Sequence, residues 1–182
     1  AKRIHAFSGP VLLAPGPAGL LFHEAIGHRL EGSRLLSAGE GQTFKGQEGK
    51  AVLNVDLDVS DNPCLARFKG QRCIGAYRYD DEGTPAAEAI LIRGGILQGF
   101  LNSRSGLPVR FNKLNGHARN QKHQRPISRM GVTIIKGNAP CSWEELKQKL
   151  IQEIKEQGKP FGMIVYETAG GETETAAYDF QA

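Results

Sequence analysis

The sequence predicts an α+β fold, with a largely antiparallel sheet built from hairpins and two main helices, one of which carries the stretch HEAIGH. Segments with strand character outnumber those with helical periodicity, and most follow one another through turns rich in glycine and proline. The chain has 182 residues, 40% of them hydrophobic and 23% charged. This size and composition suit a globular domain whose core needs neither disulfides nor a structural metal. We therefore expect a single domain spanning residues 1–182.

The first elements are a short strand and a helix. The apolar stretch GPVLLAPGP, residues 9–17, predicts a strand that ends at Pro15. A helix is expected from about Ala18 to Leu30, because apolar residues recur there at helical spacing. Its apolar stripe consists of Phe22, Ile26 and Leu30. Residues 35–50 are rich in glycine and polar side chains and predict a loop.

The middle of the chain reads as strands and turns. Alternating apolar and polar residues predict a half-buried strand over residues 51–59, and CIGAYRYD, residues 73–80, predicts a second one. The acidic residues that follow indicate a turn. They are Asp80, Asp81 and Glu82. Two apolar runs around Gly94-Gly95 predict a hairpin over residues 89–101, and GVTIIKG, residues 131–137, predicts another strand.

The second helix is expected over residues 141–159, since Ser142 and Glu145 form a capping box at its start and Gly158 suits its end. Its apolar stripe consists of Trp143, Leu146, Leu150 and Ile154. Two further strands are predicted over residues 161–167 and 174–180.

Charge is distributed unevenly along the chain. No acidic residue lies between Glu88 and Glu144, whereas nine basic residues do. The nine are Arg93, Arg104, Arg110, Lys113, Arg119, Lys122, Arg125, Arg129 and Lys136. This basic segment could contact nucleic-acid phosphates. From Arg93 to Lys136 it contains only Phe100 and Phe111 as aromatic residues and no nucleic-acid-binding motif, so we interpret it as a solvated face.

The cysteines and the lengths of the apolar runs indicate the cellular compartment of the protein. The three cysteines, Cys64, Cys73 and Cys141, form no CxxC pair, and we expect reduced thiols buried in the packing. No apolar run reaches the roughly 20 residues that span a bilayer, and the start lacks the apolar core of a signal peptide. We expect a cytoplasmic protein without membrane contact. The chain begins at Ala1 without methionine, which we interpret as a processed or excised form.

HEAIGH suggests a metal site with unusual spacing. In the common zinc helix two histidines lie four residues apart with a glutamate beside the first. Here His23 and His28 are five apart, and on a regular helix they would point about 140° away from each other. We expect the helix to deform at Gly27 through an i→i+5 turn. Glu31 is expected as a hydrogen-bond partner of His28 or, as the second choice, as a ligand.

The alternative to a metal site is an amphipathic core helix whose histidines lie on its polar side. The remaining histidines carry no signal of a site. We interpret His117 and His123 as loop residues in a basic segment, and His5 as a surface residue.

Several blocks resemble those of the TldD/PmbA family, in order and approximate spacing. They are HEAIGHRLEG, DDEGTPA, LIRGGILQGFLNSR, RPISRM before GVTII, and GGET followed by AYDF. The chain is similar to the motif-bearing, TldD-type members, which are zinc-dependent proteases; some members have been described as modulators of DNA gyrase. The resemblance implies that His23 and His28 bind Zn²⁺ and that Glu24 is the catalytic base.

The resemblance further implies a cytoplasmic homo- or heterodimer of related subunits that cleaves unfolded peptides held in extended form inside a chamber. We place the basic segment from Arg104 to Arg129 near the substrate path. Family members are much longer, with an N-terminal domain and a C-terminal stretch that supplies a cysteine as third ligand. None of the three cysteines here matches it. Gly32-Ser33 also replaces a position that is more often acidic. A non-catalytic scaffold subunit is therefore the alternative function.

Overall fold

The structure is a computed structural model that describes residues 7–36, 42–104 and 114–170. Its contacts divide the chain into two compact units, one formed by residues 7–22 with 139–170 and the other by the described residues between 23 and 138. The α-helices are α1 (Pro15–Ala25) and α2 (Trp143–Glu156), and two 3-10 helices, η1 (Gly27–Leu30) and η2 (Gly32–Leu36), follow α1. The strands are β1 (Val11–Leu13), β2 (Leu57–Asp61), β3 (Arg67–Phe68), β4 (Gln71–Arg72), β5 (Ala89–Arg93), β6 (Ile96–Leu97), β7 (Ala118–Arg119), β8 (Ile127–Ser128), β9 (Thr133–Gly137) and β10 (Met163–Val165).

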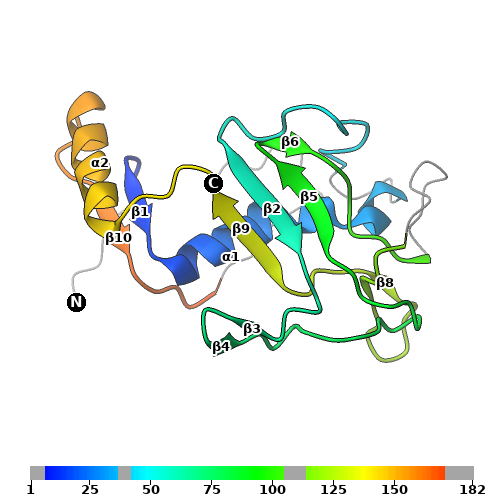
Figure 1. Cartoon of the computed structure of the whole chain (residues 1–182). Helices are drawn as coiled ribbons and strands as arrows, with labels where there is room; N and C mark the ends of the chain where they lie inside the picture. The colour runs from blue at the N-terminus through cyan, green and yellow to red at the C-terminus, as the bar shows by residue number, and fades with distance from the viewer. Residues whose placement is uncertain (1–6, 37–41, 105–113, 171–182) are drawn as a thin grey trace. The chain divides into compact units, whose positions relative to one another are not determined.

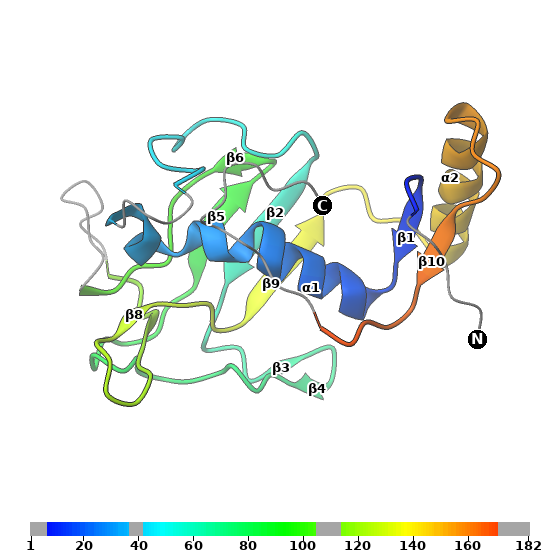
Figure 2. The ribbon, with the colours of Figure 1, turned by 180° about the vertical axis from the view of Figure 1, so that it is seen from behind.

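The first unit pairs β1 with β10 beside α2 (Figure 2). The capping box of α2 is confirmed: the Glu145 N–H donates to Ser142 Oγ at 3.2 Å, and the Ser142 N–H donates to Glu145 Oε2 at 2.6 Å. The expected strand over residues 161–167 is confirmed as β10, but it runs parallel to β1. The prediction over residues 174–180 lies outside the described residues.

The second unit is built on a four-stranded antiparallel sheet in the order β6-β5-β2-β9 (Figure 1). The hairpin of β5 and β6 is confirmed, and its turn needs both glycines because Gly94 and Gly95 have φ of 54° and 78°. The strand expected over residues 131–137 is confirmed as β9. The largely antiparallel α+β prediction is thus correct.

One strand prediction is correct only at its end, and a second is wrong. The strand expected over residues 51–59 begins only at Leu57, because the preceding backbone makes a single bridge, from Ala51 to Ile96, and then crosses the hairpin turn. The N–H groups of Val52 and Leu53 both donate to Gly95 O. Residues 73–80 form no strand either; a short hairpin of β3 and β4 precedes them, and Ile74 is 96% exposed.

The core of the second unit holds the segment after α1 in place. Leu30 is fully buried with side chains from β5, β6 and the residues that follow β6. The Leu101 N–H donates to Leu30 O, and the Gly32 N–H donates to Leu101 O, both at 2.8 Å. This approach excludes a side chain at position 32, since a Cβ there would lie 2.7 Å from Leu101 O. Residues 30–32 therefore have a fixed position beside the sheet.

Candidate metal centre

The helix that carries the first histidine changes geometry before the second. The expected helix over Ala18–Leu30 is wrong at its end, because α1 stops at Ala25 and Ile26 leaves the helical region with φ −124°. The deformation near Gly27 is confirmed, but it is not an i→i+5 turn. The chain tightens into η1, where the Arg29 N–H donates to Ile26 O. The break reorients the residues after it.

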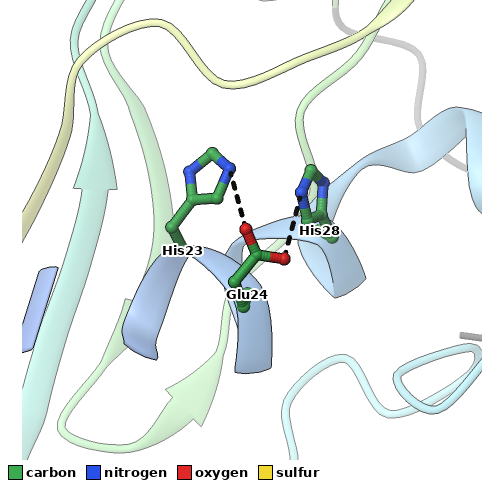
Figure 3. A group of neighbouring side chains, drawn as sticks. All are labelled: His23, Glu24 and His28. Carbon is green, nitrogen blue, oxygen red and sulfur yellow. Dashed lines mark ion pairs between the residues drawn. The ribbon is translucent and has the colours of Figure 1, made fainter. Parts of the chain in front are cut away.

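This break brings the two histidines together with the glutamate between them (Figure 3). The rings of His23 and His28 lie 4.7 Å apart, centroid to centroid, at 77° to each other. Glu24 Oε1 lies 3.8 Å from His23 Nε2, and Glu24 Oε2 lies 3.8 Å from His28 Nε2. The side chains of His23, Glu24 and His28 are 47%, 19% and 20% exposed, so the cluster opens to solvent on the His23 side.

The donor set fits a zinc ion. One ligand atom from each of His23, Glu24 and His28 lies within 4.8 Å of the others, and within the described ranges no other group of three His, Cys, Asp or Glu does so. Nitrogens that bind one tetrahedral zinc ion lie about 3.3 Å apart, so small side-chain rotations would suffice.

Glu31 supports His28 from the buried side. Its carboxylate is 1% exposed, and Oε1 lies 3.1 Å from His28 Nδ1, which confirms the expected hydrogen bond. A carboxylate only accepts, so Nδ1 is the donor in this bond, and in the neutral ring the lone pair is then on Nε2, which faces Glu24. Burial alone would raise the pKa of Glu31, but hydrogen bonds from His28 and Arg34 and the nearby charge of Arg129 outweigh it and lower the pKa.

Two arginines complete this arrangement, and the sequence interpretation missed both. Arg34 Nε donates to Glu31 Oε2 at 2.7 Å, and Arg129 Nη1 donates to the same oxygen at 2.9 Å. Arg34 could have been found from its i+3 spacing to Glu31. Arg129 lies 98 positions away, and no local pattern connects it to Glu31. The basic segment thus contributes to the centre and is not simply a solvated face.

His117 lies in the irregular segment before β7, as expected of a loop residue, but its side chain belongs to the interior. The residue is fully buried, with Nε2 3.2 Å from Asp61 Oδ1 and Nδ1 2.9 Å from Asn115 Oδ1. Asp61 also accepts from the N–H groups of Gly131 and Val132. We interpret this pair as structural. His123 is exposed in a turn, as expected, and His5 lies outside the described residues.

The acidic turn is confirmed and is well ordered by hydrogen bonds. Asp80 Oδ1 accepts from the N–H groups of Glu82 and Thr84, and Asp80 Oδ2 accepts from the N–H of Ala118. Asp81 lies 3.6 Å from Arg119. The turn therefore anchors the start of the β7–β8 pair.

The cysteines are free thiols, as expected, but the prediction that they are buried is wrong. Cys64 is exposed and Cys73 and Cys141 are partly exposed. Each lies in an irregular segment outside the core. None belongs to the cluster around His23.

Comparisons with known proteins point to a family of metallopeptidases. The model of the PmbA/TldA metallopeptidase C-terminal domain matches residues 8–182. A metalloprotease of Methanocaldococcus jannaschii is 31% identical over 171 residues, which are 94% of this chain and 34% of that protein. A zinc metalloprotease TldD homolog of Saccharolobus solfataricus is 31% identical over 168 residues, with 91% and 34% covered. The chain thus spans about a third of the length of the curated relatives it matches.

Solved structures show the same fold. TldE from Thermococcus kodakarensis has a TM-score of 0.61 at 19% identity, covering 76% of this chain and 30% of that one. A Thermotoga maritima protein described as a modulator of a DNA gyrase has a TM-score of 0.62 at 19% identity, covering 82% and 32%. The match of the family model over nearly the whole chain shows that this chain belongs to the PmbA/TldD family of metallopeptidases and corresponds to its C-terminal domain.

Proposed function

We propose that the intact protein is a zinc-dependent metallopeptidase in which His23 and His28 bind the metal and Glu24 is the general base. The observation that carries the proposal is the convergence of these side chains within 4.8 Å, in spite of a spacing that a regular helix would not allow. The fold shared with the solved structures would not be sufficient by itself, because one fold serves many functions. The site supplies the chemistry.

When bound, zinc would supply Lewis acidity that acidifies water and polarises a carbonyl group. Glu24 would accept a proton from the attacking water and return it to the leaving amine. Its carboxylate is suited to this role because it lies between the histidines and is still 19% exposed. Glu31 keeps the His28 proton on Nδ1, so that Nε2 is the nitrogen that can bind metal.

The finer parts of the proposal rest on the family resemblance. They are unfolded or extended peptides as substrates, a homo- or heterodimer with a related subunit, a cytoplasmic location, and a third ligand from a cysteine of the longer protein. We also propose that residues 1–182 form one domain of that protein. None of the helices within the described ranges is long and apolar enough to cross a membrane.

Peptide cleavage tests the proposed function. The full-length protein should hydrolyse an unfolded, labelled protein substrate, lose this activity with a chelator and regain it on addition of zinc. Activity that is unaffected by the chelator would contradict the zinc mechanism, and a complete lack of activity with every partner subunit would favour the scaffold alternative. Nucleic-acid binding is disfavoured, because Arg119 and Arg129 in the basic segment are paired with Asp81 and Glu31.

A further inference from the structure

We propose that Arg129 is a positioning residue of the metal centre, which acts through Glu31 to fix the ring of His28. This inference rests on the proposed function for its consequence, because His28 is a ligand only if the protein binds metal. The effect of Arg129 on the ring of His28 involves only residues of this chain and can be tested without metal.

The contacts place Arg129 and His28 on the same oxygen. Arg129 Nη1 lies 3.1 Å from Glu31 Oε1, which also accepts from His28 Nδ1 at 3.1 Å. The same nitrogen lies 2.9 Å from Glu31 Oε2. One guanidinium nitrogen therefore contacts both oxygens and limits rotation of the carboxylate. With the carboxylate fixed, the direction of the hydrogen bond to His28 is fixed as well.

Arg129 differs from Arg34 in what it connects. Arg34 is three residues from Glu31 and belongs to η2, the next turn of the same chain segment. Such a pair can move together with that segment. Arg129 directly follows β8, so its contact ties Glu31 to a part of the unit that is distant in sequence.

The backbone of Arg129 is itself held by buried groups. Its N–H donates to His117 O at 2.9 Å, which extends the β7–β8 pairing by one step. The His117 ring lies between Asp61 and Asn115, and Asp61 accepts from the N–H of Gly131. Hydrogen bonds thus restrain the chain on both sides of Arg129. Buried hydrogen-bond networks whose groups are all paired are rigid. The backbone from which the Arg129 side chain extends is therefore held in one position.

The position of the proton on His28 is the direct consequence. While the Glu31 carboxylate faces Nδ1, the neutral ring carries its proton there and offers Nε2 to a metal. Without Arg129, the carboxylate has one fewer restraint, and the ring can exchange between its two tautomers and orientations. A metal would then bind only the fraction of molecules with the correct arrangement.

The test compares Arg129→Met, Arg129→Lys and Arg125→Met in the full-length protein. Arg125 lies in the same β7–β8 connection and is exposed, so its substitution removes the same charge without touching Glu31. Nitrogen NMR of the metal-free protein in alkaline solution reports the His28 tautomer, and competition with a chromogenic chelator reports the zinc affinity. Arg129→Lys keeps the charge, so it can still be measured if Arg129→Met fails to fold.

We expect Arg129→Met to mix the His28 tautomers and to weaken zinc binding by about 10- to 100-fold, with Arg129→Lys between it and the wild type. Arg125→Met should change the affinity by less than about twofold, the limit set by loss of a distant surface charge. An unchanged His28 tautomer in Arg129→Met would overturn the inference. Absence of zinc binding by the wild-type protein would instead overturn the proposed function, and the tautomer measurement would still decide the role of Arg129.

Discussion

The imidazole rings of His23 and His28 lie 4.7 Å apart although the two residues are five positions apart in the sequence. A change from α-helix to 3-10 helix between Ala25 and Gly27 produces this approach. Glu24 lies between the two Nε2 atoms, at 3.8 Å from each. The extra residue, compared with the common zinc helix, is thus accommodated by local tightening of the backbone.

Replacing Glu24 with Gln should abolish peptide cleavage and leave zinc bound. The amide keeps the size of the side chain but cannot accept a proton, so we expect a loss of about 10²- to 10⁴-fold in kcat. Steady-state kinetics and elemental analysis of the same preparation check both parts. Glu88→Gln, at an exposed position, is the matched control. Cleavage at the wild-type rate by the Glu24 variant would remove this residue from the mechanism.

Asp61→Asn should destabilise the second unit strongly. Asp61 is fully buried and accepts from Gly131 N, Thr133 Oγ1 and His117, whereas an amide would bring N–H groups against these donors. We expect the free energy of unfolding to fall by about 3–5 kcal/mol, as for other broken buried pairs. Urea denaturation measures it.

Asp58→Asn on the same strand provides the comparison for Asp61. Its Oδ1 accepts from the N–H of Gly94 near the surface, so the loss should stay below about 1 kcal/mol. An equal decrease in the free energy of unfolding for the two variants would contradict a larger stabilising contribution from the buried network around His117.

Gly32→Ala should be destabilising, because the added Cβ would lie 2.7 Å from Leu101 O and 2.8 Å from Asn102 Oδ1. Gly19→Ala is the opposite case: the position lies inside α1 with nothing within 4 Å. Alanine there should raise the free energy of unfolding by about 0.5–1 kcal/mol. Thermal denaturation of both variants tests the pair. A tolerated Gly32→Ala would contradict the close approach at Leu101.

The capping box of α2 predicts a dependence on pH. Hydrogen bonds from the Ser142 N–H and hydroxyl lower the pKa of Glu145 below its usual value of about 4.3. The stabilisation is therefore complete above that value and is lost as the pH falls through the lower, folded-state pKa. The difference in Tm between the wild type and Glu145→Ala should shrink in acid. A difference that stays constant on acidification would contradict this.

The sequence predicted those parts of the fold whose signals are local. The capping box at Ser142, the Gly94-Gly95 turn and β9 each depend on neighbouring residues and are confirmed. The strand prediction for residues 51–55 is wrong, because the N–H groups of Val52 and Leu53 donate to Gly95 O, in a turn that lies far along the chain. Alternation of apolar and polar residues is not sufficient to predict a strand when the backbone N–H groups bond to a segment other than a neighbouring strand.

In the metal centre, too, local signals predicted some contacts, and contacts between distant segments could not be predicted. The i+3 spacing indicated the bond from His28 to Glu31, and the glycine indicated where the helix deforms. The tightening into η1 was not foreseen, since it depends on the bonds that fix Leu30 and Gly32 beside Leu101. Arg129 and the burial of His117 depend on long-range pairing of β7 with β8, for which two-residue strands give no periodic signal.

Zinc content is the measurement that tests the central claim most directly. The full-length protein, purified without chelator, should contain about one zinc ion per chain at this site, and the His23→Ala/His28→Ala double variant should contain none while remaining folded. Elemental analysis gives the ratio, and the control variant His123→Gln should retain zinc, because this exposed side chain does not belong to the cluster. Equal zinc in the wild type and the double variant, or none in the wild type, would contradict the account.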